Sequence, residues 1–465
     1  MPALLDTDEI IETIQMITLQ KLNIRAVTLG INLLDCVDSN VDETCRNIYG
    51  KILSYSKQFN SSSIEVQRSY GVPIVNKRIA VTPISLILSP LLRKASEGDE
   101  KDICLRVAES LDKAVMKAKV DYIGGYSCFV HRGASKADKA LINSLPEVLS
   151  KTRRVFSFIN VASTESGVNM DMVERAGQII REIAYRTRTE SSVGCAKLMV
   201  MANAAEGTPF LPGAFHSIGD SDVSLTVGIS GPGVVHAVLK NLAENAPLDD
   251  VVEAIKSTTF KVTRAGELIG KKIAEDMGID FGGVDLSLAP SPEGGNSVGE
   301  LVEDMGIERV GAPGSVLAIA VITDALKKGG SMASKYVGGQ SGVFIPVLED
   351  NIIARAASEG ALTLDHLKAM SAVCSTGLDM IPIPGDTSPK TISAIIADIV
   401  ALGIVNRKTV GARLIPVYGK KTGDWVDFGG LLGKAPIMEV SRFKPDKLID
   451  RKGRIPAPFV NLTKS

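Results

Sequence analysis

The stretch NIRAVTLGINLLD, Asn23 to Asp35, has the composition of a buried β-strand. Its apolar residues are largely β-branched, and polar residues bound the run at both ends. Isoleucines at helical spacing predict a helix before it, over 6–22, and a second helix is predicted after it, over 40–58. A buried strand that alternates with helices is the repeating unit of an α/β fold.

The rest of the first 205 residues continues this alternation. Further strands are predicted at 63–70, 121–130, 153–163 and 195–204, and the helices between them include a long one at 100–119. Strands separated by helices of about 10–20 residues favour a largely parallel, buried sheet. The predicted fold class is therefore α/β.

Length and composition set broad limits on the protein. A chain of 465 residues suggests about three domains of ~150 residues, although one closed sheet with its helices can use the same length. Apolar residues make up 45% of the sequence, which is normal for a globular protein with a sizeable core. Lys and Arg number 52 and Asp and Glu 53, so no net positive field favours nucleic acid or an anionic membrane.

The cysteines and the first residues bear on the cellular compartment. Six cysteines, with none at C-x-x-C spacing, do not form a disulfide framework. The opening MPALLDTDEIIETIQMI is acidic where a signal peptide needs positive charge. The most apolar window, VTPISLILSPLL, is too short to cross a bilayer. These features predict a cytoplasmic protein with reduced thiols.

From about residue 205, glycine and proline become dense in loops such as EGTPFLPGAFHSIGD and FGGVDLSLAPSPEGGNS. Glycine lets backbone approach a ligand closely, and proline stiffens the loop that carries a side chain. Long irregular segments in a compact chain are uncommon unless they are functional. The second half is therefore where the site is expected, with ordinary turns of a large fold as the alternative.

Cys374, in the segment SAVCSTGLDMIPIPGD (371–386), is the first candidate catalytic group. The preceding TLDHLKAMSAV predicts a short helix, and a thiol at a helix C-terminus is not favoured as a thiolate. Asp379 and Asp386, both candidate ligand-binding residues, have the wrong charge to activate it. A thiol that donates a hydrogen atom and a small buried spacer are the two alternatives.

The next segment, GDTSPKTISAIIADIV, predicts a helix that Ser388 caps and Pro389 begins. The free amides of 387–390 form a candidate anion site. Thr387 and Ser388 are therefore candidate ligand-binding residues.

His216 lies in AFHSIGDSDVSLTVGISGPGVV, with Asp220 and Asp222 shortly after it. A histidine with two carboxylates can act as a general acid–base unit or as part of a metal site. The spacing matches no standard metal motif, so no metal is predicted, and a histidine hydrogen-bonded within its loop is the structural alternative. The glycine turn with Gly231 and Gly233 resembles turns that cradle phosphate or carboxylate, without the G-x-G-x-x-G pattern.

A third polar loop spans 280–300. Asp285 is flanked by apolar residues, so we expect it to be buried with a partner, and it is another candidate acid–base residue. Glu293 and Asn296 are predicted to bind a polar ligand, with solvated loop residues as the alternative.

Polar residues also follow several of the predicted strands. Sheets of α/β proteins usually place ligands beyond the carboxyl ends of their strands, which makes these residues smaller candidates. They are His131, Arg132, Glu165, Asn203 and Glu206.

Three of these segments resemble the signature segments of a known family: FGGVDLSLAPSPEGGNSVGE, GAFHSIGDSDVSLTVGISGPGVV and SAVCSTGLDMIPIPGDTS. They are similar to those of uncharacterised protein family 0210, also called domain of unknown function 711, and the resemblance covers essentially the whole chain. Members are bacterial and archaeal cytosolic proteins, thought to be homodimers, with no established reaction. Their fold is similar to that of pyruvate formate-lyase and ribonucleotide reductase.

The resemblance implies one large domain, a ten-stranded α/β barrel whose two parallel five-stranded halves, roughly 1–205 and 206–465, are antiparallel to each other. Helices would lie outside, and a hairpin loop would run through the centre. In the radical enzymes of that superfamily, this loop presents a cysteine that becomes a thiyl radical, and the resemblance assigns that place to Cys374.

A stored glycyl radical would also need an R-V-x-G-[FYW] segment near the C-terminus. The corresponding region reads GARLIPVYGKKTGDWVDFGGLLG, in which Arg413 and Gly419 stand at the wrong spacing and Gly429 and Gly430 lie outside the motif. This departure argues against a glycyl radical in this chain.

The leading functional hypothesis is a protein that binds a small polar or anionic metabolite inside the barrel. Turnover would use Cys374 together with His216 and one of Asp220, Asp222 or Asp285. A non-catalytic metabolite-binding or regulatory protein is the alternative, and a glycyl-radical enzyme with a degenerate motif is a distant one. The expected partners are a small-molecule ligand and a second copy of the chain, with no nucleic acid or membrane. No cofactor is identified.

Overall fold

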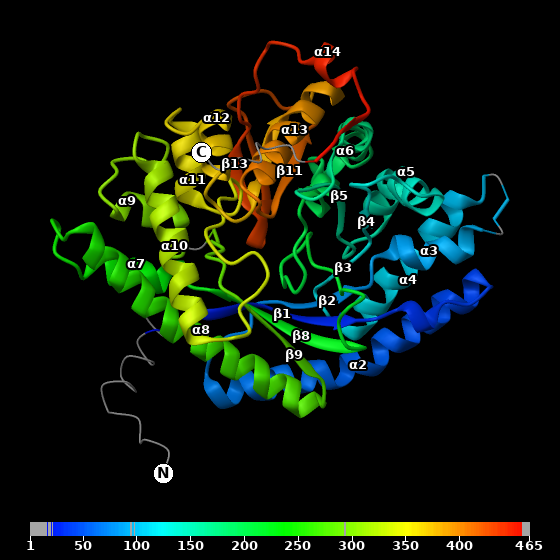
Figure 1. Ribbon diagram of the computed structural model, residues 1–465, viewed down its shortest axis with the longest axis horizontal. Helices are drawn as coiled ribbons and strands as arrows, with labels where there is room; N and C mark the ends of the chain where they lie inside the picture. The colour runs from blue at the N-terminus through cyan, green and yellow to red at the C-terminus, as the bar shows by residue number, and fades with distance from the viewer. Residues whose placement is uncertain are drawn as a thin grey trace.

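Two β-sheets surrounded by helices make up the architecture, seen here in a computed structural model (Figure 1). The structure describes residues 16, 20, 22–93, 95–96, 98–292 and 294–457. Both sheets combine parallel and antiparallel strand pairs and are covered by helices, so the predicted α/β class is confirmed.

The first sheet is centred on the strand predicted from the opening stretch. That strand, β1 (Asn23–Ile31), pairs in parallel with β2 (Lys77–Val81), which pairs in parallel with β3 (Tyr122–Gly124). On its other side β1 is antiparallel to β8 (Val223–Ser230), and β8 is parallel to β9 (Asp280–Asp285). Most residues of β1 and β8 are buried, as expected of central strands covered on both faces.

The second sheet has a similar arrangement. Strands β10 and β11 are parallel, β11 is antiparallel to β7, and β7 is parallel to β5. The smaller strands β4, β6 and β14 extend the sheet beyond β5. The bounds are β4 Cys128–Phe129, β5 Ser157–Ser163, β6 Gly167–Asn169, β7 Leu198–Ala202, β10 Gly377–Pro384, β11 Val410–Val417 and β14 Arg454–Ile455.

Isolated β-bridges connect the two sheets at both margins. Ile123, at the margin of the first sheet, pairs with Val155, just before β5. At the other margin, the segment 337–346 joins the two sheets. Val337 pairs with Val284 of β9, Val343 pairs with Leu288 just after β9, and Pro346 pairs with Asp379 of β10. The sheets therefore face each other across a common interior (Figure 1).

Helices cover the outer faces. Helices α2 and α8 pack below the first sheet, and α6 and α13 pack on the second (Figure 1). A separate hairpin is formed by β12 (Trp425–Gly429) and β13 (Gly433–Pro436). The helix bounds are α2 Val41–Tyr70, α3 Ile84–Leu92, α4 Glu100–Ala118, α5 Lys136–Lys151, α6 Met170–Arg186, α7 Pro232–Lys240, α8 Leu248–Met277, α9 Val298–Asp304, α10 Ser315–Ala333, α11 Asn351–Ser358, α12 Leu364–Ser371, α13 Pro389–Val405 and α14 Asp446–Ile449, with short 3-10 helices η1 Leu34–Cys36, η2 Arg188–Glu190, η3 Val193–Lys197 and η4 Gly430–Leu432.

One predicted strand is wrong. Residues 63–70 are not a strand but the end of α2, which continues to Tyr70 and stops at Gly71, whose φ of 71° provides a left-handed cap. Buried Phe59, Ser62, Ser63 and Val66 follow helical spacing. The true next strand is β2, which was not predicted. The helix predicted at 6–22 lies largely outside the described residues.

Asp350 joins two helices next to the interior. Its carboxylate accepts hydrogen bonds from the Ser297 hydroxyl at 2.6 Å and from the amides of Val298 and Gly299 at 2.7 and 3.1 Å, at the start of α9. It also accepts bonds from two amides of the first turn of α11, at 3.0 and 3.2 Å. One buried carboxylate therefore caps both helices and fixes the backbone beside it.

Replacing Asp350 should destabilise the fold strongly. Asp350→Ala leaves several buried donors without an acceptor, and we expect the free energy of unfolding to fall by about 3 kcal/mol or more. Chemical denaturation measures this change. In the matched control, Asp249→Ala in the exposed first turn of α8, the loss should stay below about 1 kcal/mol. Equal losses in the two variants would contradict the capping role.

Candidate functional site

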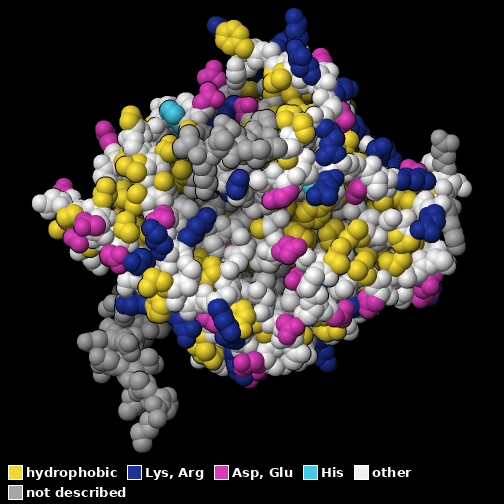
Figure 2. Space-filling view, viewed as in Figure 1, with side chains coloured by type: hydrophobic (Ala, Val, Ile, Leu, Met, Phe, Trp, Pro, Cys, Tyr) yellow, Lys and Arg dark blue, Asp and Glu magenta, His cyan; other side chains and the backbone are white. Residues whose placement is uncertain are grey.

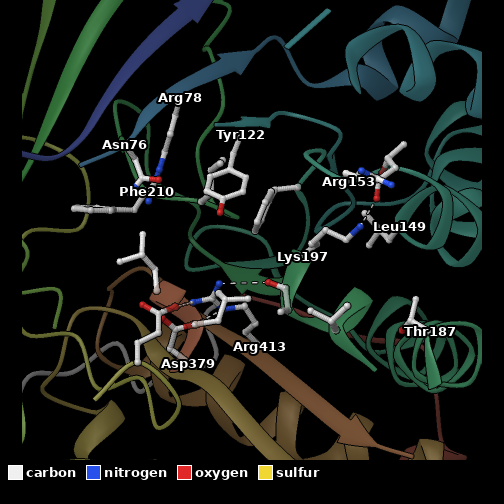
Figure 3. A pocket seen from close by; sticks show the side chains of 18 of the residues that line it. Asn76, Arg78, Tyr122, Leu149, Arg153, Thr187, Lys197, Phe210, Asp379 and Arg413 are labelled. Carbon is white, nitrogen blue, oxygen red and sulfur yellow. Dashed lines mark hydrogen bonds and ion pairs between the residues drawn. The ribbon is translucent and has the colours of Figure 1, made fainter. Parts of the chain in front are cut away.

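A cavity of about 680 Å³ lies between the inner faces of the two sheets. This volume is in the range of small-molecule sites. Figure 3 shows Arg78 and Tyr122 entering it from the first sheet, and Asp379 and Arg413 from the second. The buried part of its wall is unusually rich in charge for the interior of a protein.

Arg25 reaches the cavity from an irregularity in β1. The pairing of β1 with β8 shifts register between Ile24 and Ala26, so Arg25 is the extra residue of a β-bulge. Bulges re-aim a side chain and are common beside active sites. The guanidinium donates to the Pro290 carbonyl at 3.2 Å and lies 3.7 Å from the Glu349 carboxylate.

A second bulge carries Asp379. The pairing of β10 with β11 shifts register between Leu378 and Ile381, and Met380 adopts a φ of 50°, which is rare for a residue other than glycine. Backbone strain of this kind is concentrated at functional sites. The Asp379 carboxylate accepts a hydrogen bond from Arg413 at 2.6 Å, and a second nitrogen of Arg413 donates to the Ala196 carbonyl at 3.3 Å.

Glu349 is the less tightly paired of the cavity's two carboxylates that are not exposed; the third, Glu190, is exposed. It lies 3.4 Å from Arg413 and 3.7 Å from Arg25, and its side chain is 15% exposed, against 4% for Asp379. Burial raises the pKa of Glu349, with nearby Asp379 raising it further, and the arginines only partly offset this. The helix cap at Asp350 holds the neighbouring backbone in place.

Arg78 carries the least compensated charge in the cavity wall. Burial and the repulsion of Arg25 lower its pKa to about 10. Its Nε has no hydrogen-bond partner among the described residues, and its only close acceptor there is the Pro209 carbonyl at 3.5 Å. The guanidinium also lies 5.8 Å from the centre of the Phe210 ring. A buried cation without a carboxylate is costly unless a ligand pairs with it.

These residues form a site for anions. Guanidinium groups bind carboxylates and phosphates through two parallel hydrogen bonds, and they do so most strongly where water is excluded. Of the residues predicted from sequence that the structure describes, only Asp379 lines this cavity; Arg25, Arg78 and Glu349 were missed. The signal that could have found the arginines is a charged residue inside an otherwise apolar strand, as in NIRAVTLGI and KRIAV.

Cys374 lies outside this cavity. It is 1% exposed, in the turn between α12 and β10, and its Sγ accepts a hydrogen bond from the Gly377 amide at 3.4 Å. Lys408 donates to the carbonyls of Cys374 and Ser371, which satisfies the end of α12. The thiol therefore lies just after a helix C-terminus, as expected, and its reactivity stays a prediction.

His216 is buried away from the cavity wall. Its Nε2 is 2.8 Å from the Ser221 carbonyl and its Nδ1 is 3.8 Å from Asp220. Burial lowers its pKa, and the hydrogen bond to Ser221 and the charge of Asp220 only partly offset this. Asp222 pairs with Lys51 at 2.9 Å on the surface. The structure thus brings His216 and Asp220 together within one loop, and their catalytic role stays a prediction.

Asp285 is fully buried and has partners, as expected. It accepts bonds from the Ser287 amide and hydroxyl at 2.9 and 2.5 Å and from the Gln340 amide at 2.6 Å, and burial raises its pKa to about 6. The side-chain amide of Asn296 donates to the Ser291 hydroxyl at 3.0 Å, and its Oδ1 has no partner among the described residues. Glu293 lies outside the described residues.

The remaining predicted residues have local roles. Gly231 precedes α7, and Gly233 lies in its first turn. Asp386 is exposed, and Thr387 donates to the Pro384 carbonyl at 2.7 Å. Ser388 accepts from the Thr391 amide at 3.1 Å, which confirms it as the cap of α13.

Other candidates are dispersed. Glu206 lines a separate cavity of about 650 Å³ with Phe129 and Phe215, while His131 bonds to Asn160 at 3.1 Å. Over the part of the chain that the structure describes, no group of three or more His, Cys, Asp or Glu could hold a metal ion. No described helix is long and apolar enough to span a membrane, and Figure 2 shows acidic and basic side chains interspersed on one face.

The comparison with known proteins agrees with the resemblance drawn from the signature segments. Residues 15–436 match the family model described as Uncharacterised ACR (DUF711). A UPF0210 protein of Methanocaldococcus jannaschii is 52% identical over 456 residues, which cover 98% of this chain and 99% of the relative. UPF0210 proteins of Methanococcoides burtonii and Desulforudis audaxviator are each 50% identical, over 460 and 459 residues, covering 99% of this chain and all of theirs. The chain therefore belongs to the DUF711, or UPF0210, family.

Proposed function

We propose that this protein binds a small anionic metabolite in the cavity between its two sheets. The observation that carries the proposal is Arg78, a buried guanidinium in the cavity wall with no carboxylate partner among the described residues. Arg25 and Arg413 stand in the same wall, each already opposed by a carboxylate. An anion in the cavity would supply the charge that the protein itself does not.

We also propose that the two sheets are parts of one ten-stranded barrel of the pyruvate formate-lyase type. The barrel would form a single domain, with the boundary between its two halves near residue 205. Bridges at both margins of the sheets support closure. One half would contain β1, β2, β3, β5 and β7, and the other β8, β9, the segment 337–346, β10 and β11. The antiparallel pairs β1–β8 and β7–β11 would be the two seams.

The segment between β7 and β8 is the proposed central loop. Thr28 of β1 donates to the Pro209 carbonyl at 2.8 Å, and the absence of a side chain at Gly228 of β8 makes room for the Phe210 ring. Residues 203–222, all of them described, contain no cysteine. This weakens the glycyl-radical alternative, because Cys374 lies elsewhere in the chain. The cytoplasmic location and the homodimer stay predictions.

Removing Arg78 should abolish ligand stabilisation without harming the fold. In a thermal-shift screen of central mono- and dicarboxylates and phosphate esters, we expect at least one anion to stabilise the wild type; at 100 times its Kd the gain is about 2.7 kcal/mol. Arg78→Met should lose this gain. The ligand-free variant should be at least as stable as the wild type, because an unpaired buried charge has been replaced by an apolar chain.

The matched control is Arg106→Met, which removes an arginine of α4 that pairs with Asp42 at the surface. It should leave the ligand-induced shift unchanged. A full shift in Arg78→Met, or the same loss in both variants, would count against anion binding in this cavity.

One observation favours turnover over simple binding. Glu349 combines a raised pKa with partial exposure to the cavity, which is the state of a general acid or base poised beside its substrate. The catalytic candidate is therefore an enzyme that transfers a proton to or from the bound anion through Glu349, rather than through Cys374.

Turnover can be separated from binding with two variants. An anion identified by thermal shift is incubated with the protein in heavy water, and mass spectrometry follows product formation and deuterium uptake. Glu349→Gln should remove both while keeping or strengthening binding, since one negative charge is lost. Cys374→Ser should leave both unchanged. Loss of turnover only in a stable Cys374→Ser protein would restore the thiol as the catalytic group.

A further inference from the structure

The cavity holds more positive charge than its carboxylates neutralise. Its buried and half-buried wall has two carboxylates, each within reach of an arginine. Four cations face them, so two positive charges are left over. The cations are Arg25, Arg78, Arg413 and Lys197, and the carboxylates are Glu349 and Asp379.

Lys197 is the second uncompensated cation. It comes directly before β7, and its Nζ donates to the Thr152 carbonyl at 2.6 Å. An ammonium has three protons to donate, so this bond uses only one. No ion pair of Lys197 with a carboxylate is found among the described residues. Asp112 and Glu190 raise the pKa of Lys197 only through longer-range electrostatic attraction.

Lys197 and Arg78 belong to well-separated elements of the cavity wall. From β2, which carries Arg78, the order around the wall is β3, then β5, then β7, which begins after Lys197. Three strand spacings amount to about 14 Å along the sheet. Figure 3 shows the two side chains entering from different sides, with the Tyr122 ring between them. A ligand with one anionic group at each cation would cross this part of the wall.

The wall between the two cations is uncharged and aromatic. Tyr122 and Phe156 both line the cavity there, and their rings pack edge to face with centres 5.1 Å apart. Such a surface favours an apolar segment of a ligand.

We propose that the ligand is a small molecule with two anionic groups, one bound at Arg78 and the other at Lys197, joined by an uncharged segment over Tyr122. This rests on the proposed anion-binding function and adds the chemical class. Dicarboxylates and phosphorylated carboxylates share the required chemistry, and the experiment separates them.

The competing explanation for Lys197 is structural. Its ammonium caps the carbonyl at the end of α5, where a positive charge interacts favourably with the helix dipole. A residue with only that role would affect stability, but it would not affect the choice between ligands with one and two anionic groups.

Titration calorimetry with matched ligand pairs tests the proposal. The pairs are succinate with butyrate, glutarate with pentanoate, and 3-phosphoglycerate with glycerol 3-phosphate. We expect wild type to prefer the ligand with two anionic groups by about tenfold or more in at least one pair. The pair with the largest preference shows whether the ligand is a dicarboxylate or a phosphorylated carboxylate.

Lys197→Met should reduce the preference to about threefold or less while the affinity for the singly anionic ligand stays nearly constant. Lys197→Arg, which keeps the charge, should restore it. If wild type shows no preference, or if Lys197→Met weakens both members of a pair equally, the two-group proposal is overturned. The underlying anion-binding proposal fails separately, when neither member of any pair binds or when Arg78→Met binds both as wild type does.

The preference should also depend on pH. Burial lowers the pKa of Lys197 to about 8, against the opposing effects of Asp112 of α4, Glu190 of η2 and Cys195 of η3. Below that pH the ammonium attracts the second anionic group; above it, binding must take up a proton. The affinity for the doubly anionic ligand should therefore fall by up to about tenfold per pH unit above pH 8. A flat profile in wild type, or the same fall in Lys197→Met, would overturn the role of Lys197.

Discussion

The ion pair between Arg413 and Asp379 is the interaction on which the rest of the interior depends. At 2.6 Å, and with both side chains almost fully buried, it compensates a charge that could not otherwise stand inside the protein. The pair requires the bulge at which Met380 takes its unusual backbone conformation. It also ties β11 to the Ala196 carbonyl, next to the start of β7. The pair thus links three neighbouring strands of the second sheet and fixes this part of the cavity wall.

That ion pair explains why the other charged side chains of the cavity differ in their pairing and in their pKa. Because Arg413 is satisfied mainly by Asp379, Glu349 is left with longer contacts, greater exposure and a raised pKa. Arg78 has no carboxylate at all among the described residues. A fold built only for stability would replace such groups with apolar residues, which often costs nothing or gains stability. Their presence together in one cavity is best understood as preparation for an anionic ligand.

The sequence predicted the fold class and much of the element order but not the site. The helix over 100–119 and the strand at 23–31 follow strong patterns, whereas 63–70 is short enough to be read as either strand or helix. The site residues proposed beyond the carboxyl ends of the early strands do not line the cavity. It lies instead at the amino ends of β2, β3 and β7, because the two groups of parallel strands run in opposite directions.

The sequence by itself determined that this is an α/β protein of a recognisable family, since hydrophobic periodicity and long signature segments are local properties of the chain. It also contains the charged residues of the site, most of them within apolar strands, but it does not show which of them meet. Only the tertiary structure brought Arg25, Arg78, Glu349, Asp379 and Arg413 to one cavity. The physical reason is that pairing between buried charges depends on sheet register and on two bulges, which join segments hundreds of residues apart and leave no spacing to read along the chain.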